Sequence, residues 1–289
     1  MNLKTEIEKV LEKFVGSNVA IDAFMAVGGG SINETYKLTT DNDDFFVKKN
    51  SASLYPHMFE NEATGLGILK EAGEIDIPDV VGNGECCGES FLILKYIQSG
   101  VKTKSFWDVF GKQLAALHKH TDEKFGLDHD NYIGSLVQYN NKHDNWNDFF
   151  IQERLDKQVR FARNNGEIDK GTVVVFDRFY TKLENIFPAE PPALLHGDLW
   201  GGNFMVNQVG LPVIIDPAVY YGHREMDLGM SQLFGGFDKR FYESYNNHYP
   251  LERGWEERLD YCNLYPLMVH VNLFGGGYIQ SVKSILKKF

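Results

Sequence analysis

The stretch 195–203, LHGDLWGGN, and the run 214–216, IID, decide how this sequence is interpreted. Asp198 and Asn203 are five residues apart, and Asp216 follows Asn203 by 13 residues at the end of an apolar run. A loop aspartate can accept a hydroxyl proton, while an asparagine and a strand-end aspartate can hold Mg²⁺ around a nucleotide. Asp-x-x-x-x-Asn is common by chance, but the whole run followed by an apolar strand ending in aspartate is not. We therefore predict a catalytic Asp198 and Mg²⁺ ligands in Asn203 and Asp216.

A glycine-rich turn precedes this stretch in the chain. Its residues are Gly28, Gly29, Gly30 and Ser31. Glycines let backbone N–H groups approach phosphate oxygens closely, although a glycine-rich turn is more often only a turn. The sequence is neither a G-x-x-x-x-G-K-[ST] loop nor a G-x-G-x-x-G. We predict that this turn covers the phosphates of a nucleotide.

A lysine and a glutamate follow the turn. Lys48 ends an apolar strand and could reach the α- and β-phosphates, unless it is an edge lysine that limits aggregation. Strand alternation puts Lys49 on the opposite face, so Lys48 is the preferred candidate. Glu60 and Glu62 both lie on a predicted helix over 58–72, but only Glu62 shares a face with its apolar residues. We expect Glu62 to pair with Lys48, the alternative being a solvated helix glutamate.

Hydrophobic periodicity predicts an α+β protein in two parts. The first part, 1–98, contains predicted helices over 3–15 and 58–72 and five strands over 20–27, 32–39, 44–49, 77–81 and 90–97. The larger part, 99–289, is mainly helical, with predicted helices over 105–118, after a capping box, 146–163 and 173–187, further helices after 227, and strands near 204–206 and 212–215. A cleft between the two lobes is the expected ligand site.

The composition excludes several classes of protein. The 289 residues are 43% hydrophobic, which is enough to bury a core and argues against disorder. A net charge of −11 and a pI near 5.3 argue against a nucleic-acid partner. No stretch has the roughly 20 apolar residues of a membrane span, and the N-terminus has no secretory signal. Three cysteines indicate neither a disulfide framework nor a zinc site, so we expect a cytoplasmic protein.

Together these features resemble the bilobal protein-kinase-like fold, which implies an antiparallel five-stranded sheet with one helix in the N-lobe. The chain has His-Gly-Asp where protein kinases have His-Arg-Asp, and Pro217 and Ala218 follow Asp216. It has no room for a typical activation segment before Asp227 and no Ala-Pro-Glu. The chain therefore looks like a small-molecule kinase of the aminoglycoside-phosphotransferase-like group.

Within that group the sequence is similar to the fructosamine kinase (ketosamine-3-kinase) family. The resemblance spans nearly the whole chain, and its most specific part is the HGDLW segment; the other matching runs are 29–33 with Tyr36, 46–48, 58–59 with Glu62, 65–66 and 270–276. The family implies ATP- and Mg²⁺-dependent phosphorylation of the sugar O3 of ketosamines, which are glycation adducts carrying a fructosyl, ribulosyl or erythrulosyl sugar. The 3-phosphate destabilises the adduct and releases the amine, a deglycation. Some members carry a cysteine in the glycine-rich loop that forms an intersubunit disulfide; Ser31 stands there, so we expect no such switch.

The resemblance also implies roles for residues outside the main motifs. The backbone of Lys95, Tyr96 and Ile97 is expected to pair with adenine. Trp200 would stack on the substrate or pack under the loop. Asp227 is expected to brace the catalytic loop, and His270 to belong to the core.

Two other functions compete with the ketosamine kinase. One is a kinase for another small hydroxyl compound, such as an aminoglycoside or an amino alcohol, for which Trp200 is less typical. The other is a nucleotide-binding pseudoenzyme, which is disfavoured because Lys48, Asp198, Asn203 and Asp216 are all present. We therefore expect a small glycated amine as the partner of the site.

Overall fold

The computed structural model describes residues 2–28 and 32–289, and they form two compact units. The first unit comprises Met1–Thr103 and Met205–Asp216, and the second comprises Lys104–Phe204 and Pro217–Phe289. The division drawn from the sequence left residues 205–216 with the helical part. In the structure this segment packs on the first unit, where the N–H of Ile214 donates to the carbonyl of Asp76 at 3.0 Å.

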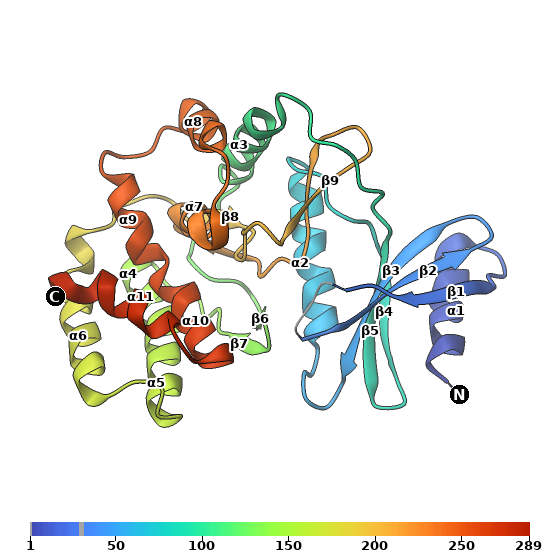
Figure 1. The fold of residues 1–289 in the computed structure, drawn as a ribbon, viewed down its shortest axis with the longest axis horizontal. Coiled ribbons are helices and arrows are strands. Elements are labelled where there is room, and N and C mark those ends of the chain that lie inside the picture. Colours follow the sequence, from blue (N-terminus) through green and yellow to red (C-terminus); the bar gives the residue numbers. More distant parts are fainter. Residues whose placement is uncertain (1, 29–31) are drawn as a thin grey trace. The chain divides into compact units, whose positions relative to one another are not determined.

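The first unit is built on one five-stranded antiparallel sheet, which confirms the predicted α+β sheet (Figure 1). The strand order is β1-β2-β3-β5-β4. The strands are β1 (Ile21–Ala26), β2 (Glu34–Thr40), β3 (Asp44–Ser51), β4 (Val80–Cys86) and β5 (Glu89–Lys95). The prediction of a strand over 77–81 was wrong: β4 begins at Val80 and runs through polar and glycine residues, because its pairing with β5 outweighs their low strand propensity.

Two helices cover opposite faces of this sheet (Figure 1). Helix α1 (Leu3–Val15) begins where the Asn2 side chain accepts a hydrogen bond from the N–H of Thr5. Its buried residues pack with alternate residues of the sheet in one core cluster; that cluster is Ile7, Leu11, Ile21, Leu38, Phe45, Val47, Phe91 and Ile93. Because strand side chains alternate, the residue after Val47 points to the other face, the one covered by helix α2 (Met58–Ala72). This alternation directs Lys48 toward α2.

A short hairpin, which belongs to the first unit from Met205 onward, completes that unit. Its strands are β9 (Phe204–Val206) and β10 (Pro212–Ile214), which confirms both predicted strands and the turn between them. Asp216 follows β10 after one residue.

The second unit is mainly helical, as predicted. Its α-helices are α3 (Phe106–Leu117), α4 (Trp146–Phe149), α5 (Asp156–Asn164), α6 (Lys170–Tyr180), α7 (Glu225–Gln232), α8 (Lys239–His248), α9 (Trp255–Cys262), α10 (Leu264–Phe274) and α11 (Tyr278–Ile285). A π-helical turn (Phe150–Leu155) joins α4 to α5, and short 3₁₀ turns lie at Leu183–Asn185, Leu233–Gly235 and Leu286–Lys288. Sequence analysis missed two strand pairs, β6 (Asn131–Ile133) with β7 (Leu136–Gln138) and β8 (Ala193–Leu195) with β11 (Tyr220–Gly222). Each has three residues, too few to show an alternating pattern.

Helices α3 and α8 approach each other very closely. A Cβ atom on Gly111 would lie 2.2 Å from the carbonyl oxygen of Phe241, so only glycine fits at this contact. Ser105 precedes α3 but makes no side-chain cap hydrogen bond, so the predicted capping box was wrong. The φ and ψ of Ser105, −95° and 8°, lie outside the extended region that an N-cap normally adopts.

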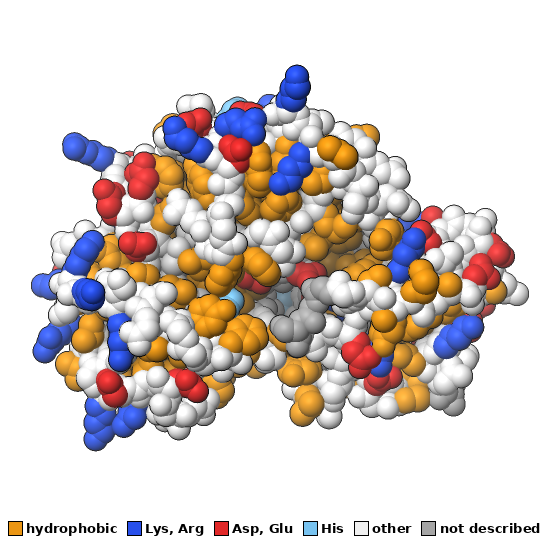
Figure 2. Space-filling model, in the orientation of Figure 1, with side chains coloured by type: hydrophobic (Ala, Val, Ile, Leu, Met, Phe, Trp, Pro, Cys, Tyr) orange, Lys and Arg blue, Asp and Glu red, His pale blue; other side chains and the backbone are white. Residues whose placement is uncertain are grey.

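The surface carries charge of both signs. Figure 2 shows Lys and Arg side chains and Asp and Glu side chains distributed over the face drawn, with groups of hydrophobic side chains between them. Among the residues described, no helix combines the length and the apolar character needed to cross a membrane.

Candidate functional site

Lys48, Glu62 and Asp216 form one ion-paired group in the first unit, here called the Lys48 cluster. The Lys48 ammonium lies 2.7 Å from Oε1 of Glu62 and 2.5 Å from Oδ1 of Asp216. Its side chain is only 3% exposed, and that of Glu62 is 11% exposed. The predicted pairing of Lys48 with Glu62 is thus confirmed, whereas the rejected Glu60 is 66% exposed and contacts His57.

With both carboxylates ionised, the Lys48 cluster carries one negative charge in excess, because one ammonium faces two carboxylates. Burial alone would lower the pKa of Lys48, but the charges of Asp216 and Glu62 outweigh it and hold that pKa above its ordinary value. Burial raises the pKa of Glu62, and the neighbouring Asp216 carboxylate adds to that rise. An excess negative charge at a buried lysine is an arrangement that a divalent cation would neutralise.

Asp216 occupies a strained position at the end of the β10 segment. Its φ is 54°, a left-handed conformation that is uncommon for a residue other than glycine. Such strain is typical of functional sites, where surrounding structure holds a side chain in place. The Asp216 side chain is 42% exposed, so it is less buried than the side chains of Lys48 and Glu62.

The loop 196–203 in the second unit holds Asp198 by backbone geometry. The N–H of Asp198 donates to Nδ1 of His196 at 3.2 Å, and the carbonyl of His196 accepts from the N–H of Ala218 at 2.9 Å. Gly197 has φ 84°, and a Cβ there would lie 1.9 Å from the carbonyl oxygen of Ala218. The His-Gly-Asp sequence therefore requires glycine at its centre.

Asp227, at the start of α7, braces this loop as predicted. Its Oδ2 accepts the N–H of His196 at 2.8 Å, and its Oδ1 accepts the N–H of Gly197 at 2.9 Å. Burial would raise the pKa of Asp227, but the hydrogen bond with His118 and the loop amides bring it below its ordinary value. Asp227 is therefore ionised at neutral pH and fixes the start of the loop.

Asn203 closes the other end of the loop. Its Nδ2 donates both to the backbone carbonyl and to Oδ2 of Asp198, each at 2.9 Å. Its side chain also carries an amide oxygen, and oxygen is the ligand that Mg²⁺ prefers. Taken separately, the side chains of Asn203 and Asp216 each carry the type of oxygen ligand that magnesium binds.

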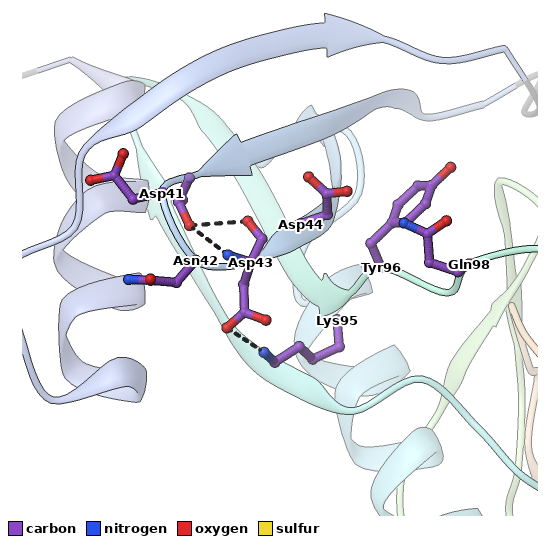
Figure 3. Close-up of a pocket in the computed structure, with 8 residues that line it drawn as sticks. Asp41, Asn42, Asp43, Asp44, Lys95, Tyr96 and Gln98 are labelled. Atoms are coloured by element: carbon purple, nitrogen blue, oxygen red, sulfur yellow. Dashed lines mark hydrogen bonds and ion pairs between the residues drawn. The ribbon is translucent and has the colours of Figure 1, made fainter. Parts of the chain in front are cut away.

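The predicted adenine segment begins at Lys95, the last residue of β5, and both Lys95 and Tyr96 line a hollow of about 380 Å³ (Figure 3). The N–H of Lys95 donates to Asp79 and the N–H of Tyr96 donates to Asp44, so these two amides are already used within the unit. The Lys95 ammonium points into the hollow and pairs with Asp43 at 2.8 Å. Among the backbone hydrogen bonds of the described residues, none uses the N–H of Ile97. This amide is therefore the backbone donor of the segment that could bind a ligand.

The glycine-rich turn lies at the edge of what the structure describes. Gly28 is exposed, and a Cβ there would meet nothing within 4 Å. The predicted sites at Gly29, Gly30 and Ser31 lie outside the described residues.

Trp200 belongs to an aromatic group on the second unit that sequence analysis did not anticipate. Its ring centroid lies 5.8 Å from that of Phe234, which in turn lies 4.7 Å from His270. Phe234 is 45% exposed and has φ 57°, a rare conformation for a bulky residue. His270 is half-buried rather than fully in the core, and burial lowers its pKa. In the sequence, the one feature that indicates a turn at this place is the pair of glycines directly after Phe234.

Sequence analysis also missed side chains that hold the catalytic loop and the segment after Asp216. One of them is His118, whose Nε2 lies 3.2 Å from Oδ2 of Asp227. Gln138 donates to the carbonyl of Ala218 at 3.0 Å, and Asn131 donates to that of Val219 at 2.8 Å. These partners are distant in sequence, so no local pattern marks them.

The fold resembles known structures over its full length. A solved structure from Haemophilus somnus, described as a fructosamine-3-kinase, is 30% identical, with a TM-score of 0.90 and 99% coverage of both chains. The aminoglycoside phosphotransferase APH(4)-Ia is only 14% identical, with a TM-score of 0.65 and 98% coverage of both chains, and shares the fold. The fold is therefore of the protein-kinase-like type predicted from the sequence.

Relatives in sequence agree with this fold. A protein of Synechocystis named probable ketoamine kinase is 38% identical over 98% of this chain and 95% of its own length. The chloroplastic protein-ribulosamine 3-kinase of Arabidopsis thaliana is 38% identical over 95% of this chain and 84% of its own. A model of the fructosamine kinase family matches residues 3–289. The predicted phosphotransferase with an alcohol acceptor is thus confirmed, and the chain belongs to the fructosamine kinase family.

Proposed function

We propose that the protein is an ATP- and Mg²⁺-dependent kinase that phosphorylates O3 of the sugar in ketosamines. The observation that carries this proposal is the loop 196–203, where buried Asp227 fixes one end and Asn203 hydrogen-bonds to Asp198 at the other. Bound ATP supplies the phosphoryl group, with Mg²⁺ neutralising charge on its phosphates. The product 3-phosphate would favour release of the amine from the sugar.

Asp198 is the proposed catalytic residue. Its carboxylate accepts the proton of the attacking hydroxyl, and Asn203 orients it through the hydrogen bond to Oδ2. Because phosphoryl transfer depends mainly on positioning and charge stabilisation, a single well-held carboxylate suffices on the acceptor side.

The Lys48 cluster is the proposed phosphate and metal site. Lys48, oriented by Glu62, stabilises negative charge on the α- and β-phosphates. Asp216 and Asn203 are the proposed Mg²⁺ ligands, Gly28 to Ser31 cover the phosphates, and the carbonyl of Lys95 and the N–H of Ile97 pair with adenine. The excess negative charge of the Lys48 cluster supports a cation at Asp216.

Trp200 is the proposed acceptor contact. It lies two residues after Asp198, and its group with Phe234 and His270 presents partly exposed rings. Aromatic rings stack on sugar faces and attract cations, and a ketosamine has both a sugar and an ammonium group.

ADP release with a panel of acceptors tests this function. The panel contains fructosyl-lysine, ribulosyl-lysine, erythrulosyl-lysine, an aminoglycoside and choline, each with and without Mg²⁺, and Asp198→Asn serves as the blank. We expect Mg²⁺-dependent turnover confined to the ketosamines, with the phosphate on O3 by NMR. Turnover only on the aminoglycoside or choline would replace the proposed acceptor, and silence on all five while ATP still binds would reject the ketosamine kinase.

A further inference from the structure

Two cysteines that the proposed kinase reaction does not use meet at the tip of the β4–β5 hairpin. The sulfur atoms of Cys86 and Cys87 lie 3.0 Å apart, and neither residue is in a disulfide. Cys87 is exposed and Cys86 is partly exposed, while the third cysteine, Cys262, is fully buried. Cysteine is among the residues most often buried, so an exposed pair is unusual.

The turn of this hairpin has a backbone conformation that is unusual for a cysteine. Cys86 pairs with Glu89 across the two strands, which leaves Cys87 and Gly88 as a two-residue turn. Both have positive φ, 60° and 83°, the pattern of a type I′ turn. The first position of that turn favours asparagine, aspartate or glycine, and a cysteine there is strained. A strained side chain at an exposed position is a reason to look for a function.

The separation of the two sulfurs suits a bridge of one atom better than a direct bond. A disulfide normally joins Cα atoms at least 4.4 Å apart, whereas consecutive Cα atoms are about 3.8 Å apart, so an S–S bond here would be strained. If each sulfur bound one atom at about 2.3 Å, the length of a zinc–thiolate bond, the 3.0 Å separation would give an angle of about 80° at that atom. A pyramidal trivalent centre has angles of this size, while a tetrahedral metal needs wider angles and more ligands.

The surroundings do not supply those additional ligands or an activated thiolate. Among the described residues, no group of three His, Cys, Asp or Glu side chains could hold a metal ion. The contact with Cys87 raises the pKa of Cys86, and Glu6 on α1 adds to this rise. This direction is opposite to that of a nucleophilic cysteine, whose pKa is lowered.

We propose that Cys86 and Cys87 form a dithiol site that chelates trivalent arsenic compounds of the type R–As=O. In the reaction both S–H bonds and the arsenic–oxygen bond break, and two As–S bonds form. The oxygen leaves with the two protons as water. Arsenic stays trivalent, so no oxidant or reductant is needed.

Phenylarsine oxide and intact-protein mass spectrometry test this site on the folded protein in the presence of a monothiol such as 2-mercaptoethanol. The wild type should gain one adduct, of the mass of phenylarsine oxide less one water, and 2,3-dimercaptopropanol should remove it. Cys86→Ser and Cys87→Ser should each bind about 10²-fold more weakly, because the second bond of a chelate acts at high effective concentration. The double variant keeps Cys262 as an internal control and should gain no adduct.

Three results would overturn the proposal: no adduct on the folded wild type, binding by both single variants as tight as that of the wild type, or an adduct that persists in the double variant. Circular dichroism of each variant checks its folding, and the exposed turn makes unfolding by serine unexpected. Cys87→Asn, which suits the turn, provides a second one-thiol variant with the same expected loss.

Discussion

The Lys48 cluster and the loop 196–203 hold their carboxylates by different means. In the Lys48 cluster, Asp216 and Glu62 are held by ion pairs to one ammonium, and Asp216 is 42% exposed. In the loop, Asp198 is held by hydrogen bonds with the side chains of His196 and Asn203, and the loop is anchored on fully buried Asp227. Ion pairs can rearrange when a cation or phosphate arrives, whereas buried hydrogen bonds fix geometry. Charge partners can therefore change in the first region, whereas the second region keeps one carboxylate in place.

The largest expected loss of activity follows from a substitution in the loop 196–203. Asp198→Asn should lower kcat by about 10²- to 10⁴-fold, because the amide cannot accept the hydroxyl proton. ATP affinity, measured by calorimetry, should stay within about twofold, since the change neither adds a charge to the Lys48 cluster nor removes one from it.

Asp260→Asn is the matched control, because Asp260 is exposed on α9 in the same unit. It should leave kcat unchanged. Near wild-type turnover by Asp198→Asn would remove Asp198 from the catalytic role and with it the contrast between the two regions.

The next largest loss of activity is expected in the Lys48 cluster. The neighbouring Lys49 provides a matched control within the same strand. Lys48 and Lys49 are adjacent on β3, and each contacts two carboxylates, but those of Lys49, on Glu34 and Glu89, are 64% and 36% exposed. Lys48→Met should lower kcat/KM by about 10²- to 10³-fold, because it removes charge stabilisation at a buried site. Lys49→Met should change it less than about threefold, since exposed ion pairs contribute little.

Steady-state kinetics with ATP as the varied substrate measure both variants. Equal losses in Lys48→Met and Lys49→Met would mean that the two faces of β3 do not differ in function. Retained activity in Lys48→Met would show that the Lys48 cluster only supports the fold.

A smaller effect is expected where the loop is anchored. Asp227→Asn replaces a charged acceptor of two backbone amides by a neutral side chain with one carbonyl oxygen. The free energy of unfolding should fall by about 1–3 kcal/mol, and kcat should fall about ten- to hundredfold with KM for ATP unchanged. Urea unfolding and steady-state kinetics measure the two effects, and a variant with full kcat would show that the anchor is not needed for positioning.

The pH dependence of this variant gives an independent check. The pKa of Asp227 is lower in the folded protein than its ordinary value of about 3.9, so its ionised form stabilises the fold above that pH. This contribution is lost as the pH falls below about 4 toward the folded pKa. The stability difference between the wild type and Asp227→Asn should therefore shrink in acid; a difference that grows instead would contradict the sign of the shift.

Sequence analysis anticipated features of both regions but missed contacts between residues that are far apart in the chain. The sheet and the pairing of Lys48 with Glu62 could be predicted, because strand alternation and helix faces are local patterns. The brace at Asp227 was expected only from the resemblance to kinase-like folds. The polar strand β4 could not be predicted, because only its pairing with β5 makes it a strand. The partners His118 and Gln138 could not either, since their hydrogen bonds join residues 80 or more positions apart.

The smallest effect is expected for Trp200, the residue of the loop 196–203 that is proposed to contact the acceptor. Trp200→Phe should raise KM for the ketosamine about two- to tenfold, the size of one aromatic contact, with kcat and ATP affinity unchanged. Trp255→Phe, at the start of α9, is the matched control and should change neither constant. If Trp200 only packs beneath the loop, the substitution should instead lower kcat and stability and leave KM unaltered, because a loosened loop misplaces Asp198 without weakening the acceptor contact. The ratio of the two constants therefore decides whether the ring touches substrate or supports the residue that does.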